Sequence, residues 1–265
     1  MQKNKVIYIA GVLLLSMLAG CMPLEVLDDP EGESDPKTIA ELILKYRCAY
    51  YTFDNGAADD VSAVGDSYNG VVFNEPKFLD DTPSGTGKSL FLNGAKQQYV
   101  NIPYNVFKDM DYFTISCWIK DFSNGSIVSG ISSSDDIKAQ WPRLYMQDDG
   151  KILFWTMGNG YNDNPPYAYN YASIQSSGWH HIAVTCIKNE DQYKNDCILK
   201  LYIDGKLMDN VSAWWKNPSE VNKVQIGGNG QGAFPVWSSM KIDNVSIFYA
   251  ALGDGVIKYI YDNRL

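Results

Sequence analysis

The segment from Gly158 to Ser173 alternates aromatic side chains with side chains that carry amides or carboxylates. Its candidate ligand-binding residues are Tyr161, Asp163, Tyr167, Tyr169 and Tyr171. Successive residues of an extended chain point to opposite sides, so Tyr167, Tyr169 and Tyr171 would share one face. Aromatic rings stack on the C–H faces of sugars, while amides and carboxylates bind sugar hydroxyl groups. The segment therefore predicts a site for a neutral oligosaccharide.

Two further positions add aromatic residues to this predicted site. Trp141 and Arg143 lead into a predicted strand, and Trp214 and Trp215 lie in a predicted loop. Tryptophan suits such a site because its large flat ring carries one polar N–H group. The alternative is that these loops fold back and bury their rings over the core of the protein, and for either Trp214 or Trp215 alone this is the simpler interpretation.

Glycoside hydrolysis would require two carboxyl groups on either side of the scissile bond. Glucanases with sandwich folds usually place a Glu-x-Asp-x-x-Glu triplet on one strand, and this sequence contains no such triplet. His180 and His181 are the only histidines, and neighbouring residues of a strand cannot both face one site. The sequence therefore favours binding without catalysis, with an enzyme that uses other carboxylates as the alternative.

The segment from Gly85 to Ser89 resembles a phosphate-binding loop only superficially. The motif requires a glycine where this chain has Thr82, and a helix must follow the loop. Here the loop leads into a predicted strand, so the helix dipole that would bind a phosphate is missing. The net charge of −9 also disfavours nucleic acid as a partner.

The first twenty residues have the pattern of a secretory leader. Two lysines lie within residues 1–5, and residues 6–19 are almost entirely apolar. This apolar run is shorter than the ~20 residues of a membrane-spanning helix. Residues 18–21 (LAGC) then look like a bacterial lipobox, which predicts cleavage before Cys21 and a lipid anchor on its thiol.

The rest of the chain divides into a tether and one domain. Residues 21–37 are rich in proline and acidic side chains, which predicts a solvated tether at the cell envelope. We expect the outer membrane as its location, on either face. From residue 38 to residue 265, short β-type runs are separated by turn residues, and Asp204-Gly205 among them predicts a hairpin turn. Helical spacing occurs only near both ends. This pattern predicts one all-β domain, a two-sheet antiparallel β-sandwich.

Several stretches of this domain occur in an order typical of one family. They are YTFDNG (51–56), SLFLNG (89–94), YVNIP (99–103), FTISCWIK (113–120), GWHHIAVT (178–185), LYIDGK (201–206), IGG (226–228) and IDNVSIF (242–248). Together they resemble the laminin-G-like domains of the concanavalin A-like lectin/glucanase superfamily. The resemblance covers roughly residues 46–261 and implies the jelly-roll form of the sandwich.

The resemblance also implies a structural Ca²⁺ between the first strand and the last long strand. Calcium binds six to eight oxygen atoms from carboxylates, carbonyl groups and water. The matching acidic residues are Asp54, Asp60, Asp66 and Asp243. Family members often have two acids at the closing motif, whereas this chain has Asn244 in the second position. The alternative is that these aspartates only stabilise turns and bind no metal ion.

Four cysteines are left once Cys21 is lipidated. Cys186 and Cys197 flank a loop between two predicted strands, so hairpin pairing would bring them close together. Export permits disulfides, and we expect a disulfide between these two residues. Cys48 and Cys117 lie in the middle of predicted strands, where a buried cysteine acts as a small apolar residue.

The sequence as a whole predicts a lectin-like lipoprotein that binds a neutral oligo- or polysaccharide or a glycoprotein. A glycoside hydrolase or lyase on the same scaffold is one alternative. An adhesion module that binds another envelope protein is the other. The fold alone does not decide between these functions, because one scaffold can host many sites.

Overall fold

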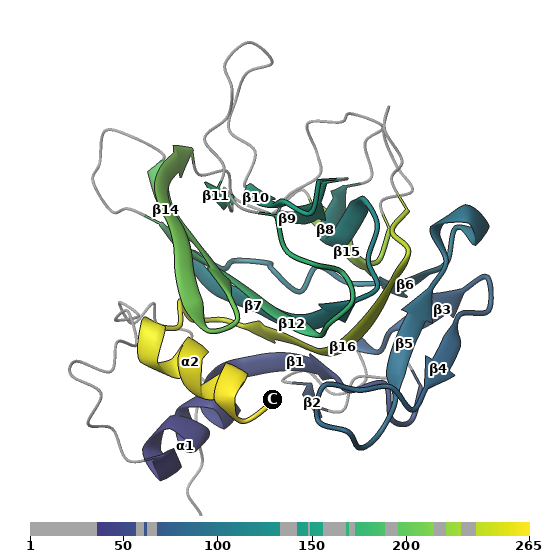
Figure 1. Ribbon diagram of the computed structural model, residues 1–265. Coiled ribbons are helices and arrows are strands. Elements are labelled where there is room, and N and C mark those ends of the chain that lie inside the picture. Colours follow the sequence, from purple (N-terminus) through teal and green to yellow (C-terminus); the bar gives the residue numbers. More distant parts are fainter. Residues whose placement is uncertain are drawn as a thin grey trace, which may run out of the picture.

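Two antiparallel sheets face each other across an apolar core, which confirms the predicted sandwich (Figure 1). The computed structural model describes residues 36–56, 61–62, 68–132, 142–147, 149–155, 168–169, 173–188, 196–214, 221–228 and 237–265. The predicted leader, the lipidation site and most of the tether therefore lie outside the described residues.

The larger sheet contains nine strands. They are β1 (Arg47–Tyr51), β2 (Val61–Ser62), β4 (Lys77–Leu79), β5 (Ser89–Leu92), β7 (Tyr112–Lys120), β12 (His180–Lys188), β13 (Asp196–Ile203), β14 (Lys206–Trp214) and β16 (Met240–Phe248). Their order is β14-β13-β12-β7-β16-β1-β2, and β5 pairs with both β16 and β4. Strands that are far apart in the chain, such as β1 and β16, are therefore neighbours in this sheet.

The smaller sheet contains seven strands. They are β3 (Val71–Phe73), β6 (Tyr99–Ile102), β8 (Gly125–Ser132), β9 (Arg143–Met146), β10 (Ile152–Trp155), β11 (Ala168–Tyr169) and β15 (Val221–Ile226). Their order is β11-β10-β9-β8-β15-β6-β3. The short strands β3 and β11 form the two edges of this sheet.

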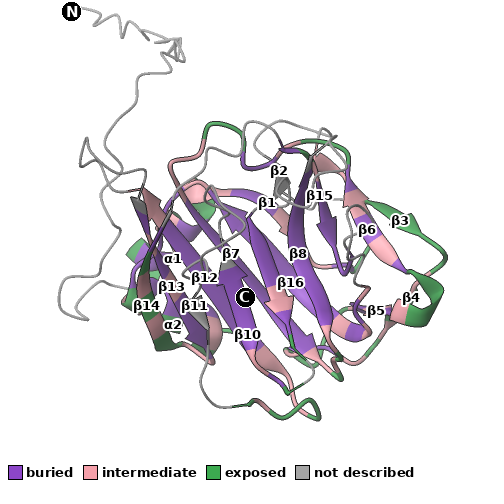
Figure 2. Ribbon diagram, turned by 90° about the horizontal axis from the view of Figure 1, so that it is seen from above, coloured by how far each residue is buried: buried purple, intermediate pink, exposed green. Residues whose placement is uncertain are grey.

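The core lies between the sheets because side chains alternate along each strand. On β7, Phe113, Ile115 and Cys117 belong to the core cluster, whereas Thr114 and Trp118 face the other side. Figure 2 shows the buried strands in the middle of the molecule and the exposed β3 and β4 at one margin. The burial of Cys117 confirms its prediction as a small core residue.

Two helices cover the outer face of the nine-stranded sheet (Figure 1). They are α1 (Pro36–Tyr46) and α2 (Asp254–Asp262), and a short 3-10 helix spans Gly94–Lys96. A second apolar cluster joins both helices to the sheet and includes Ile39, Ile43, Ala183, Tyr202, Ile257 and Ile260. Neither α1 nor α2, the α-helices of the described residues, has the length and apolar character needed to cross a membrane.

The turn between β13 and β14 confirms one sequence prediction and corrects another. Asp204 and Gly205 both have positive φ angles, 50° and 72°, as the predicted Asp-Gly hairpin turn requires. The strand that follows this turn was not expected, and it continues to Trp214. Trp214 therefore ends a strand rather than lying in a loop. Residues 206–214 form a strand because they pair with β13 along its whole length, from Ile203 to Asp196.

Candidate functional site

Four polar residues form a row across the outer face of the seven-stranded sheet. Asn101 pairs with Gln225, and Gln225 pairs in turn with Ser129. Ser129 pairs with Arg143 on the next strand. Directly opposite residues of an antiparallel pair place their side chains side by side on one face. We call these four residues the polar row.

The alternation of each strand explains why the polar row faces outward. Val100, Leu144 and Val224 are next to members of the row in the sequence, and all three belong to the core cluster. Since neighbouring residues point to opposite faces, burying these apolar side chains directs the polar ones away from the core. The strands are thus amphipathic, and their pairing aligns the polar positions.

Three members of the polar row are buried although they lie outside the core, and Asn101 is partly buried. Ser129, Gln225 and Arg143 are 0%, 3% and 7% exposed. Arg143 Nε donates a hydrogen bond to Ser126 Oγ at 3.0 Å, and its guanidinium lies 4.9 Å from the Tyr145 ring centroid. Burial lowers the pKa of Arg143 to about 10, so the side chain keeps its positive charge at neutral pH.

Ser129 has an unusual position within this row. Its Oγ atom is buried and has no hydrogen-bond partner among the described residues. An unpaired buried polar group costs about 1–3 kcal/mol, which folding does not recover. A water molecule or a ligand hydroxyl that reached this buried position would supply the partner that the hydroxyl group lacks. This orphaned hydroxyl marks the row as a candidate binding site.

The structure brings two of the sequence-predicted ligand residues to this sheet. Arg143 belongs to the polar row, and Tyr169 pairs with Leu153 on β10. Leu153 also pairs with Tyr145, which follows Arg143 by two residues on β9. Tyr169 therefore belongs to the row of paired residues next to the polar row. Trp214 is in the other sheet, but its strand β14 contacts β11. Trp141, Tyr161, Asp163, Tyr167, Tyr171 and Trp215 lie outside the described residues.

Asn101, Ser129 and Gln225 were missed in the sequence. The only signal for them is a polar residue between apolar ones, as in Val100-Asn101-Ile102 and Val224-Gln225-Ile226. This pattern occurs in most exposed strands, so it does not distinguish a binding residue from a solvated one. The alignment of the three positions depends on strand pairing between residues more than 90 positions apart.

Two of the four acids predicted to bind calcium lie in the described part of the chain. Asp243 is 3% exposed, and its Oδ1 accepts a hydrogen bond from the N–H of Asn244 at 2.8 Å. Burial, together with the nearby charge of Asp54, raises the pKa of Asp243 to about 8. Asp60 and Asp66 lie outside the described residues.

The residues around Asp54 and Asp243 fit a calcium ion in their chemistry. Both supply carboxylate oxygen atoms, which are the ligands that Ca²⁺ prefers. Asp54 Oδ1 also accepts a hydrogen bond from the N–H of Lys88 at 2.6 Å. Among the described residues, no group of three or more histidine, cysteine, aspartate or glutamate side chains is arranged to hold a metal ion. Calcium therefore stays a prediction.

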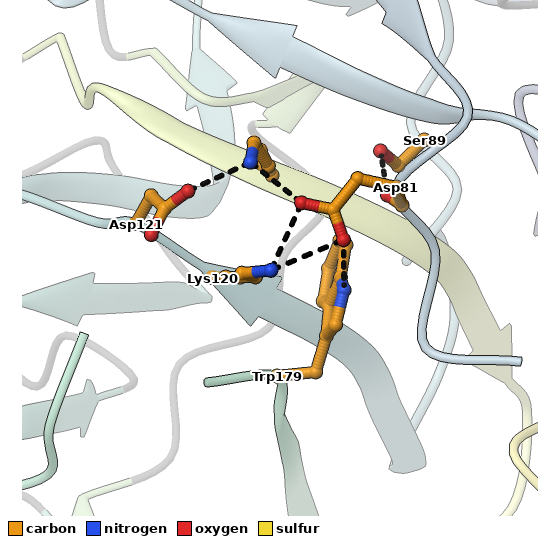
Figure 3. Close-up of polar contacts among 6 residues, drawn as sticks. Asp81, Ser89, Lys120, Asp121 and Trp179 are labelled. Carbon is orange, nitrogen blue, oxygen red and sulfur yellow. Dashed lines mark hydrogen bonds and ion pairs between the residues drawn. The ribbon is translucent and has the colours of Figure 1, made fainter. Parts of the chain in front are cut away.

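A second polar cluster surrounds Asp81, at the ends of β7 and β16 (Figure 3). Lys120 and Lys241 donate to its carboxylate at 2.9 Å and 2.6 Å, and Trp179 Nε1 donates at 3.1 Å. Lys241 also pairs with Asp121 at 2.8 Å. The hydrogen bond from Lys241 contributes most to lowering the pKa of Asp81 to about 2. Two lysines face two carboxylates here, so we interpret the cluster as a structural link between loops.

The two histidines have separate structural partners. His180 Nδ1 lies 2.8 Å from Asp204 Oδ2, and His181 Nε2 lies 2.8 Å from Ser116 Oγ. His181 is fully buried, and this burial lowers its pKa to about 3, so it is neutral at physiological pH. The described structure places each histidine in a different environment, as strand alternation requires.

The structure has Cys186 and Cys197 as two buried thiols with a side-chain hydrogen bond between them, and the expected disulfide stays a prediction. Cys186 pairs with Leu199, and Cys197 pairs with Lys188. The two cysteines are therefore diagonal neighbours, and their side chains reach each other across the strand pair. The sequence placed both residues at the ends of one loop, but the register separates them by two positions.

Comparison with known proteins gives matches to one family and to several solved structures. A family model described as the concanavalin A-like lectin/glucanases superfamily matches residues 93–258. Domain 4 of AbnA, a GH43 extracellular arabinanase from Geobacillus stearothermophilus solved with arabinotriose, has 17% identity and a TM-score of 0.56. That match covers 80% of this chain and 97% of the arabinanase domain.

Binding domains of botulinum neurotoxins are also similar in fold. A type C structure, described as dependent on two ganglioside molecules for cell entry, has 15% identity and a TM-score of 0.58. The type G receptor binding domain has 13% identity and the same TM-score. These matches cover 85% and 83% of this chain but only 53% and 51% of the neurotoxin chains. No curated protein matches the sequence significantly.

Proposed function

Because this chain belongs to the concanavalin A-like lectin/glucanase superfamily, we propose that it binds carbohydrate through the polar row without cleaving it. The observation that carries this proposal is the buried Ser129 hydroxyl without a partner among the described residues. Sugars offer hydroxyl groups that both donate and accept hydrogen bonds, as do the amides of Asn101 and Gln225. The similar folds of an arabinanase domain solved with arabinotriose and of a type C neurotoxin structure described as dependent on gangliosides for cell entry support this proposal.

The composition of the polar row favours binding over hydrolysis. Its members supply two amides, one hydroxyl and one guanidinium group, and none of them is a carboxylate. Glycoside hydrolysis needs a carboxylic acid and a second carboxylate on either side of the scissile bond. The guanidinium group of Arg143 carries several N–H groups, which can donate hydrogen bonds to the hydroxyl oxygen atoms of a neutral sugar.

Ser129→Ala tests this function because binding and stability should change in opposite directions. Removing the hydroxyl deletes a hydrogen bond to the ligand, so we expect a roughly fivefold to tenfold loss of affinity. The same change relieves an unpaired buried group, so the free energy of unfolding should stay equal or rise by up to ~1 kcal/mol. An array of neutral oligosaccharides identifies the ligand, and calorimetry with the best binder measures the affinity.

Thr185→Val is the matched control for this experiment. Thr185 Oγ1 is also buried without a partner among the described residues, but it lies on β12 in the other sheet. We expect this variant to gain stability in the same way and to keep full affinity. Unchanged affinity in Ser129→Ala would contradict the role of the polar row, and release of reducing sugar from the bound glycan would favour the hydrolase instead.

We also propose that the protein acts at the cell envelope, anchored by a lipid on Cys21. The leader pattern and the four-residue lipobox support this proposal, as does the acidic tether that follows. In cells given a radioactive fatty acid, we expect label on the wild-type chain and on Met22→Ala, but not on Cys21→Ala. Label on the Cys21→Ala variant would contradict the anchor.

A further inference from the structure

Residues 261–265, the end of α2 and the residues after it, lie against the outer face of the nine-stranded sheet (Figure 1). Trp118 on β7 and His181 on β12 are paired residues on this face. The Tyr261 ring stacks on Trp118 at 5.7 Å between centroids and lies 6.1 Å from the His181 ring. We call residues 261–265 the outer cap.

His181 is buried beneath the outer cap with only one of its ring nitrogens paired. Its side chain is 0% exposed. The Nε2 atom lies 2.8 Å from Ser116 Oγ, whereas the buried Nδ1 atom has no hydrogen-bond partner among the described residues. A neutral imidazole carries one N–H group and a protonated imidazole carries two. A proton added to His181 would therefore leave a charged N–H group buried without an acceptor.

The charged groups that face His181 do not remove this cost. Asp204 Oδ2 lies 2.8 Å from His180 Nδ1, and its Oδ1 accepts the backbone N–H of His181 at 3.0 Å. Its carboxylate thus attracts a charged His181 ring without accepting a hydrogen bond from it. Arg264, which belongs to the outer cap, repels the same charge. Burial is the main reason that the pKa of His181 falls to about 3.

The other titrating groups near the outer cap respond to acid differently. Burial raises the pKa of Asp243, which pairs with Trp118 on β16, to about 8, and the hydrogen bond to Asp204 raises the pKa of His180. A raised pKa means that the folded state binds its proton more tightly, so Asp243 and His180 favour the folded state as pH falls. Burial opposes it, but the hydrogen bond from His180 lowers the pKa of Asp204, which therefore stays charged above about pH 4.

The start of α2 is held by contacts that do not involve His181. The Tyr202 hydroxyl donates to Asp254 Oδ1 at 2.7 Å, and Lys200 Nζ lies 3.6 Å from the same oxygen atom. Ile257 and Ile260 are buried in the second apolar cluster. A charge on His181 therefore acts on the end of α2 and leaves its first turns in place.

We propose that His181 is an acid-sensitive switch: a proton taken from the solvent releases the outer cap from Trp118, while the start of α2 stays attached. This inference is independent of the proposed function. Release lets water reach Nδ1 and moves the Arg264 charge away, so the open state accepts the proton that the closed state resists. The outer face of the sheet then exposes the Trp118 ring in acidic surroundings and covers it in neutral ones.

Hydrogen exchange of the outer cap measures this opening. The backbone N–H groups of Arg264 and Leu265 donate to the carbonyl oxygens of Tyr261 and Ile260 at 3.2 Å and 3.1 Å. The full-length chain is compared at pH 7.5 and pH 4.5 in a chelator, with rates corrected for the intrinsic effect of pH on exchange. We expect the open population to rise about 100-fold, because each pH unit below ~6.5 favours the open state tenfold.

His181→Gln and His181→Phe should abolish this response. Glutamine keeps a polar side chain next to Ser116, phenylalanine keeps the volume of the ring, and neither side chain takes up a proton. We expect less than about a threefold change in opening between the two pH values in both variants. His180→Gln is the matched control, because the chain has only two histidines, and it should open in acid as the wild type does.

Two results would overturn the switch. One is an equal acid response in the wild type and in both His181 variants. The other is an equal rise in exchange along β16, which would show that acid unfolds the whole domain instead of freeing the outer cap. A rise confined to the outer cap, present in His180→Gln and absent from both His181 variants, supports the switch whatever the protein binds.

Discussion

Replacing Asp243 with asparagine is expected to stabilise the calcium-free protein by roughly 5–6 kcal/mol at about pH 8 and above. Asp243 is 3% exposed, and burial together with the nearby charge of Asp54 raises its pKa to about 8. The folded protein must therefore ionise a buried carboxyl group at high pH, which costs free energy. Asparagine keeps the shape of the side chain and its acceptor oxygen for the N–H of Asn244, but it never ionises.

The same pKa shift predicts how stability depends on pH. The unfolded chain loses the Asp243 proton near its usual pKa of 3.8, whereas the folded chain keeps it until about pH 8. Between these values the folded state binds more protons, so the contribution of Asp243 to stability falls as pH rises. Thermal melting at several pH values in a chelator should show this decline in the wild type and a weaker decline in Asp243→Asn.

Added calcium should reverse the order of stability of the wild type and Asp243→Asn. A cation between Asp54 and Asp243 would favour the ionised carboxylates, so we expect added Ca²⁺ to raise the melting temperature of the wild type. Asp243→Asn should lose most of this response. Asp109→Asn is the control, because Asp109 is exposed and its positive φ suits asparagine. An equal melting temperature of the wild type with calcium and with chelator would contradict the calcium proposal.

Replacing Trp118 with alanine is expected to lower the free energy of unfolding by about 3–5 kcal/mol. Trp118 is fully buried on the outer face of the nine-stranded sheet, under α2. Its ring stacks on Tyr261 at 5.7 Å, and the Arg264 guanidinium lies 4.7 Å from it. Its Nε1 donates to the carbonyl oxygen of Leu265 at 3.1 Å. Alanine removes all of these contacts and leaves a cavity beneath the helix.

Trp118→Phe separates the contribution of the packed ring from that of the hydrogen bond to Leu265. Phenylalanine keeps most of the ring but cannot donate to Leu265, so it should cost less than alanine. Urea denaturation measures both variants, and hydrogen exchange of the α2 amides shows whether the helix detaches first. A loss below 1 kcal/mol in Trp118→Ala would show that α2 is held by its apolar residues, such as Ile257 and Ile260.

The outer cluster beneath α1 and α2 was not predictable from the strand pattern. The helical spacing near both ends of the domain indicated two short helices, and the structure confirms them at Pro36–Tyr46 and Asp254–Asp262. Where they pack depends on Ala183, Tyr202 and Phe248, which face outward on three strands of the larger sheet. Apolar residues on both faces of a strand blur its alternation, so the sequence cannot say which face a helix covers.

The sequence by itself determined the class of fold and most of its strands. Runs such as Phe113–Lys120 and Met240–Tyr249 predict strands because β-branched and aromatic residues fit a pleated, buried surface. The Asp204-Gly205 turn was predictable for a similar reason, since few residues accept positive φ angles. These are local properties, and each depends only on residues close together in the chain.

Only the tertiary structure decided which side chains meet. Asn101, Gln225, Ser129 and Arg143 come from four strands, and the register of those strands aligns them. The same pairing places Cys186 and Cys197 diagonally and puts Tyr99 between Phe73 and Trp237. A shift of one residue in any strand would turn its side chains to the other face. Strand register is set by packing across the whole sandwich, so the candidate site emerges only when the chain is folded.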